Sequence, residues 1–296
     1  MSKCATRNHS QYSYHAHAYG FAGQLERPFR HTIPTQASAV LGTHGGQGHH
    51  RVENFRHEGI ISFDAAYVEV GGSYDECHNQ HTSFSSAIIE KLNILDMVTA
   101  DRVVSRIAVY SGDMDDKSSE NTYNITGSHF ENLKIAGHKI DVKLATHIFQ
   151  ENNSHSKLAE KHKAGELDEW LLASKLGKLK EPDLQELEEE YHALEGMSEV
   201  INQWKKPGSK RATDRIPFSP LNHMDIKDHA GRDTELRGFG SIICIPKFGV
   251  VRLAELTFHH HHCTLTMLRV DMCSTGTGTG TTTTTSGGGS KPGGGG

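Results

Sequence analysis

Residues 140–145 read Ile-Asp-Val-Lys-Leu-Ala, with an apolar side chain at every second position over the first five. Successive side chains of an extended chain point to opposite faces, so this alternation predicts a strand that is buried on one face. The same period of two recurs over residues 61–67 and 103–109. Gly137-His138 marks a turn that would join residues 130–136 to residues 140–145 as a hairpin. These patterns predict a mainly β protein built from antiparallel strands.

Two more segments carry an apolar signal. Residues 250–258 and 265–272 flank four consecutive histidines, which predicts a hairpin that turns around the histidine run. Residues 83–95 are ambiguous because Phe84, Ile88 and Leu92 fall at helical spacing behind Thr and Ser residues. The same side chains also fit a buried strand, and the period alone leaves both structures open.

Residues 156–205 differ in composition from the segments on either side. They are rich in Leu, Glu, Lys and Ala, which are good helix formers. Pro182 suits the first turn of a helix, and apolar residues follow it at spacings of three and four. We therefore predict a helical insertion over 156–205 that packs on the sheet or on itself and interrupts one β domain of residues 35–272. A coiled coil that binds a partner is the alternative.

The two ends of the chain have compositions of their own. Residues 1–34 are rich in His, Tyr and Gly with little periodicity, which predicts a flexible or extended N-terminal segment. Residues 273–296 form a low-complexity Thr/Gly/Ser tail, which cannot offset its ordering entropy and is predicted to be disordered unless a partner orders it. The predicted fold is an antiparallel β-sandwich or jelly-roll-like domain with a helical insertion and a disordered Gly/Thr tail.

Charge and cysteine content narrow the class of protein. The formal net charge of the 296 residues is −5, which argues against a nucleic-acid-binding protein, because such proteins cluster Lys and Arg. Met1–His9 contains no apolar region, and no apolar run is long enough to span a bilayer, so we expect neither a signal peptide nor a transmembrane segment. Five cysteines without a CxxC pair fit a reducing compartment, and together these features predict a cytoplasmic location.

Histidine is the compositional anomaly, with 22 copies. On a strand, His15-Ala16-His17 would place both imidazoles on one face, as metal sites require. In the extended run His259–His262 at most two rings would converge on one ion, and the adjacent thiolate could add a ligand. The candidate ligands for zinc or copper are therefore His15, His17, His259, His261 and Cys263. A polar hairpin loop and accidental clustering are the structural alternatives.

No catalytic motif stands out. The sequence has no HExxH, no GxSxG, no GxxxxGK[ST] and no GxGxxG that follows a strand. We therefore predict no catalytic residue, no cofactor other than a metal held by the histidines, and no enzymatic activity.

Three segments together resemble a known group of proteins. They are VTADRVV at 98–104, FENLKIAG at 130–137 and IPKFGVVRLAE at 245–255. In order and spacing they are similar to bacterial β-rich proteins of unknown function that include exported proteins of the choice-of-anchor type. The resemblance covers most of residues 35–272 outside the helical insertion. It implies an all-β domain with an extracellular or surface role, and it transfers no functional residue.

Three functions remain as hypotheses. The first is a structural or self-assembling β protein, such as a surface or fibre subunit, that forms homo-oligomers through exposed strand edges or terminal segments. The second is a metal- or carbohydrate-binding module that uses the histidine-rich segments. The third is a metal-dependent hydrolase, which would need at least three His or carboxylate side chains in one pocket.

Overall fold

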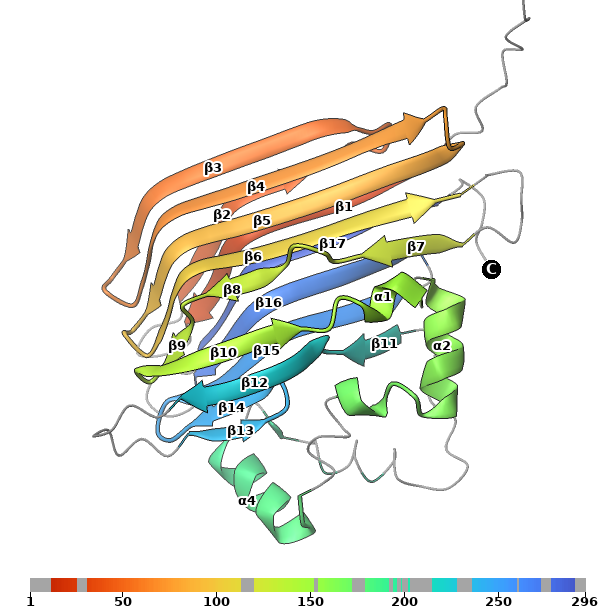
Figure 1. The fold of residues 1–296 in the computed structure, drawn as a ribbon. Helices are drawn as coiled ribbons and strands as arrows, with labels where there is room; N and C mark the ends of the chain where they lie inside the picture. The colour runs from red at the N-terminus through yellow and green to blue at the C-terminus, as the bar shows by residue number, and fades with distance from the viewer. Residues whose placement is uncertain are drawn as a thin grey trace, which may run out of the picture.

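The chain folds into two antiparallel sheets that lie face to face (Figure 1). This computed structural model describes residues 12–25, 31–112, 120–151, 154–171, 179–191, 194–195, 198, 202, 215–227, 236–259, 261–272 and 278–290. The mainly β, antiparallel sandwich expected from the alternating patterns is confirmed. None of the helices in these ranges is long and apolar enough to cross a membrane.

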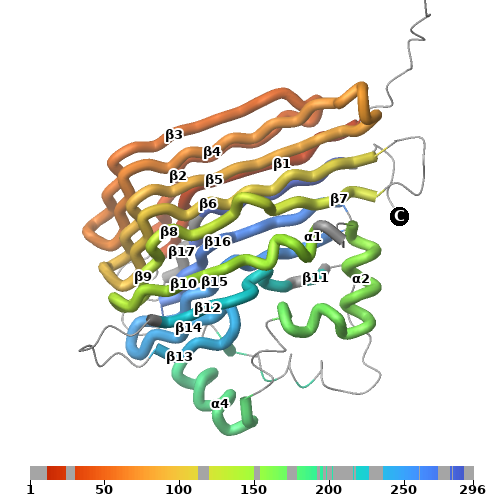
Figure 2. Tube along the Cα trace, in the orientation of Figure 1, coloured from red at the N-terminus to blue at the C-terminus, as the bar shows by residue number. Residues whose placement is uncertain are grey.

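Sheet A joins the two ends of the chain. Its strands are β1 (Ser13–Leu25), β2 (His31–Val40), β11 (Arg215–Phe218), β13 (Arg237–Phe239), β14 (Ile242–Ile245), β15 (Gly249–His259), β16 (His262–Met272) and β17 (Gly278–Ser290). Their order is β13-β14-β15-β16-β17-β1-β2, with β11 paired to β15. The last strand in the sequence therefore lies between the first strand and β16, as the rear sheet in Figure 2 shows.

Sheet B is built from the middle of the chain. Its strands are β3 (Gly46–His57), β4 (Ile61–Asp75), β5 (Gln80–Ile94), β6 (Val98–Ser111), β7 (Asn121–Asn124), β8 (His129–Glu131), β9 (Lys134–Ile135), β10 (His138–Leu144) and β12 (Leu221–Lys227). Their order is β12-β10-β9-β6-β5-β4-β3, with β7 and β8 also paired to β6. Strand β3 thus forms one edge of this sheet and β12 the other.

The core lies between the sheets. Along β5, buried and partly exposed residues alternate, with Ala87, Ile89 and Leu92 on the buried side. Residues 83–94 therefore belong to a strand, which settles the choice that the sequence left open. The hairpin predicted around Gly137-His138 is also present, because His138 of β10 pairs with Ile135 of β9.

The predicted helical insertion is present in the described parts of 156–205. Its elements are α2 (His155–Ala164), the 3-10 helix η1 (Asp168–Trp170) and α4 (Glu181–Glu190), after the short α1 (Ile148–Glu151) that precedes it. Ser154 caps α2 and Gly165 ends it in the left-handed conformation. Leu184 and Leu187 of α4 form a buried cluster with residues of β14 and β15. The insertion therefore packs on the sheet, covering one face of sheet A near its β13 edge (Figure 1).

The prediction of a disordered tail was wrong for residues 278–290. This segment forms β17 and hydrogen-bonds β1 on one side and β16 on the other. Thr283 and Thr285 are fully buried. Residues 1–34 were predicted to be a flexible or extended segment; of these, 13–25 form a central strand of the domain. Residues 1–11, 26–30, 273–277 and 291–296 lie outside the described residues.

Candidate functional site

Four of the histidines meet on the outer face of sheet A. On β1, Tyr14 and Ala16 point into the core, so the alternating His15 and His17 point outward. The hairpin of β15 and β16 follows the same rule: Phe258 is buried, and its neighbour His259 is only partly covered. We call the four outward residues His15, His17, His259 and His262 the imidazole row.

The sheet register explains how the two ends of the chain come together here. His15 pairs with Gly288 of β17, and Gly288 also pairs with His262 of β16. His15 and His262 therefore flank a residue that has no side chain. Their ring centroids lie 6.3 Å apart, His15 lies 6.0 Å from His17, and His262 stacks on His259 at 4.3 Å. The HxH pair and the histidine run, predicted separately, thus form one surface feature.

Burial and neighbouring imidazoles oppose the protonation of His262 and His17. Burial and the neighbouring His259, His15, His261 and His17 lower the pKa of His262 to about 4. Burial, followed by His15, also lowers the pKa of His17. The charged groups that act on His262 are all imidazoles, so the neutral form is favoured at pH 7. Neutral imidazole is the form that binds metals.

The predicted ligand Cys263 does not join this face. Its side chain is fully buried in the core, on the opposite side of β16 from His262, and burial raises the pKa of its thiol. Including Cys263 was wrong because adjacent residues of a strand point to opposite faces. His261 lies exposed in the turn, and its backbone carbonyl accepts hydrogen bonds from Asn121 Nδ2 and Gly289 N–H, each 3.1 Å long.

The side chains of the imidazole row do not converge on one point. Within the described ranges, no three or more His, Cys, Asp or Glu residues are arranged to hold a metal ion. The zinc or copper site therefore remains a prediction, and filling it would require the exposed rings to rotate.

A buried polar network, which no local sequence pattern predicts, holds β17 beneath the imidazole row. From sheet B, Ser83 Oγ donates to the Gly288 carbonyl at 3.2 Å and Asn121 Nδ2 donates to the Gly289 carbonyl at 3.1 Å. Ser105 and Thr285 hydroxyls lie 2.7 Å apart. Because these partners come from distant strands, only the folded register brings them together.

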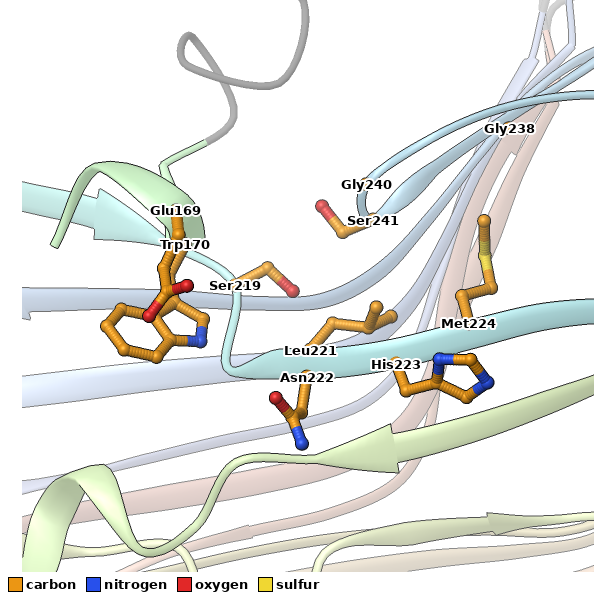
Figure 3. Close-up of a pocket in the computed structure, with 10 residues that line it drawn as sticks. All are labelled: Glu169, Trp170, Ser219, Leu221, Asn222, His223, Met224, Gly238, Gly240 and Ser241. Carbon is orange, nitrogen blue, oxygen red and sulfur yellow. The ribbon is translucent and has the colours of Figure 1, made fainter.

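A second feature is a polar hollow of about 290 Å³ near the β12 and β13 edges of the two sheets. Figure 3 shows Glu169 and Trp170 of η1 at one end of it and residues 221–224 of β12 along another side. Gly238 of β13 also lines it, and a Cβ there would lie 3.0 Å from the Met224 methyl group. Trp170 is only half-buried and lines this hollow.

Comparison with known proteins identifies a family for this chain, but it does not identify an activity. A family model described as "Domain of unknown function (DUF8256)" matches residues 12–259, which is more than half of the chain. The match ends at His259, so β16 and β17 lie beyond it. Neither the curated proteins nor the solved structures contain a match.

Proposed function

We propose that this chain, which belongs to the DUF8256 family, is a non-enzymatic structural protein that self-associates through the free edge of sheet B. Strand β3 carries this proposal. It is 12 residues long and, in the described part of the chain, pairs only with β4. The unpaired backbone groups of such an edge are a template for a further strand.

The side chains of β3 are complementary to those of a second copy. Arg51 and Glu53 form an ion pair and are about half exposed, with Val52 between them packed against the core. If two copies of β3 pair antiparallel about Val52, Arg51 of each copy lies opposite Glu53 of the other. Such a twofold interface is closed, and both cross-strand charge pairs are attractive.

The β13 edge of sheet A is less suited to this pairing. Strand β13 is only three residues long, and α4 covers the adjacent β14 and β15. At the β3 side, β2 is the neighbouring edge of sheet A, and its Ser38 N–H donates to His50 Nδ1 of β3 at 3.2 Å. Both sheets therefore present a long edge on the same side of the molecule (Figure 1).

The terminal segments are less suited to this role. Strands β1 and β17 already pair on both sides within sheet A.

The similarity of residues 98–104, 130–137 and 245–255 to exported choice-of-anchor proteins supports a surface location for the assembly.

Charge exchange on β3 tests the proposal. The molar mass of the full chain, measured by light scattering across a concentration series, should rise from one copy to two. Glu53→Arg places like charges opposite each other twice; at up to about 1 kcal/mol for each pair, association should weaken by up to about 30-fold. The double variant Arg51→Glu/Glu53→Arg should restore association. Glu160→Arg, which makes the same charge change on α2, should leave association unchanged. A chain that stays monomeric throughout, or a Glu53→Arg variant that associates like the wild type, refutes the proposal.

The hollow at η1 supports a second candidate, carbohydrate binding. An indole ring beside a carboxylate, an amide and hydroxyls suits a sugar, which offers an apolar face and a rim of hydroxyl groups. The sugar-binding residues would then be Glu169, Trp170 and Asn222, and not the histidine segments. Soluble oligosaccharides titrated into the full chain should quench tryptophan fluorescence, and Trp170→Ala should abolish binding. Absence of binding to neutral and acidic oligosaccharides alike would exclude this candidate.

A further inference from the structure

We propose that the imidazole row binds one Zn²⁺ or Cu²⁺ ion and that the bound ion fastens the terminal strand β17 into sheet A. The row draws its members from β1, β15 and β16, so residues about 245 positions apart along the chain lie on one exposed face. This inference is independent of the self-association proposed for β3.

The distances within the row fit shared coordination after small side-chain rotations. With metal–nitrogen bonds of about 2.0–2.1 Å, two imidazoles bound to one tetrahedral ion have ring centroids roughly 5 Å apart. The spacings of 6.0 Å for His15–His17, 6.3 Å for His15–His262 and 4.3 Å for His259–His262 lie on either side of that value. His15 is exposed, so its ring can turn toward His262.

Gly288 makes this approach feasible. It is the residue of β17 between His15 and His262, and any side chain there would stand between the two rings. A Cβ at this position would already lie 2.7 Å from the Cβ of His262. The Gly-rich end of the tail thus leaves the gap between the two histidines open.

The chemistry of the row favours zinc or copper over a hard cation. Its donors are imidazole nitrogens, which suit zinc and copper, whereas calcium and magnesium prefer oxygen ligands.

Coordination would also have a mechanical effect. His15 lies on β1 and His262 on β16, the two strands that flank β17. An ion bound to both side chains links β1 to β16 over the outer face of β17, so β17 could leave the sheet only after a metal bond breaks. Metal binding should therefore stabilise the backbone of residues 278–290 more than the rest of the sandwich.

The experiment uses the full chain, purified without an affinity tag or a nickel column. Zn²⁺ alone, and then Cu²⁺ alone, are titrated by calorimetry, and backbone hydrogen exchange is followed with and without the metal. We expect one ion per chain and slower exchange over residues 278–290. His15→Gln/His262→Gln should weaken binding at least tenfold and abolish the added protection. The matched control His44→Gln/His147→Gln removes two exposed imidazoles from the turns before β3 and α1, and it should change neither result.

The histidine run alone is the rival explanation. A run of four histidines can bind a metal ion whatever the conformation of the run, and the ion would then be bound without a ligand from β1. The single variant His15→Gln separates the two, because only the folded row uses this residue. The proposal is overturned by a metal affinity that His15→Gln leaves unchanged, by the absence of binding, or by binding that leaves exchange over 278–290 unaltered.

Discussion

Replacing Gly288 by alanine tests whether the tail is an integral strand. A Cβ at this position would lie 2.1 Å from the carbonyl oxygen of His261 and 2.7 Å from the Cβ of His262. The first contact is with backbone, which no rotamer change can relieve. Strand β17 would therefore have to move away from β16 in Gly288→Ala.

The size of the effect follows from the contacts that such a movement disturbs. Overpacking by a single methyl group costs about 1–3 kcal/mol. The shift also strains the 3.2 Å bond from Ser83 Oγ to the Gly288 carbonyl and the 3.1 Å bond from Gly289 N–H to the His261 carbonyl. At about 1 kcal/mol for each bond, the free energy of unfolding should fall by about 3–5 kcal/mol in total. For a chain of this size, that corresponds to a melting temperature roughly 6–20 °C lower.

Thermal unfolding followed by circular dichroism measures this loss. Gly42→Ala is the matched control, because the nearest atom to a Cβ at Gly42 is a backbone oxygen 3.9 Å away. Gly42→Ala should unfold within about 2 °C of the wild type. If Gly288→Ala unfolds at the same temperature as Gly42→Ala, β17 is not held in sheet A, and the argument from its register fails.

Three other predictions concern the core and the titrating groups. Phe258→Ala should lower the free energy of unfolding by about 3–5 kcal/mol in urea titrations, because the buried ring packs against Tyr123, Phe218 and Phe149 with centroids 5.1, 5.2 and 5.6 Å away. The pKa of His262 falls from 6.5 to about 4 on folding, so the unfolded chain takes up its proton first. Stability should therefore be complete above pH 6.5 and decrease as the pH falls toward 4, by on the order of 2 kcal/mol after allowance for solvent screening. The melting temperature of His262→Gln should depend less steeply on pH over this range, and an unchanged slope would contradict the assignment. In a Cys4→Ser/Cys273→Ser background, a thiol reagent should label the exposed Cys77 and spare the buried Cys244 and Cys263 until the protein unfolds; rapid labelling of three thiols would contradict their burial.

Local patterns were sufficient to predict much of the sandwich. The alternation over 140–145 and the Gly137-His138 turn specify β10 and its hairpin, since both signals depend only on near neighbours in the sequence. The apolar spacing of residues 83–95 fitted both a helix and a strand. Phe84 and Ile88 suggested a helical stripe, but in the structure they lie on the less buried face of β5. Pairing with β4 and β6 on both sides determines the strand, and a single sequence does not reveal that pairing.

The tail shows where composition misleads. Thr and Gly bury little apolar surface, so residues 278–290 were expected to be disordered. In the structure the neighbours supply the missing interactions: Ile107 and Val109 fill the space beside Gly287, and Ser83 of sheet B donates to the Gly288 carbonyl. The side-chain direction of Cys263, by contrast, follows from the sequence once β16 is known to begin at His262.

The two proposed surfaces depend on different parts of the chain, so an experiment can refute one proposal and leave the other standing. All strands of sheet B lie within residues 46–227, so the strand pairing that leads to the β3 edge does not include the terminal strand. Sheet A is continuous only when β17 joins β1 to β16, so the imidazole row requires both ends of the chain. Gly288→Ala should therefore weaken metal binding at temperatures where self-association through Arg51 and Glu53 persists, and Glu53→Arg should do the reverse. If either substitution abolished both properties in a folded chain, the two surfaces would be coupled through the core, and the independent roles argued for them would be wrong.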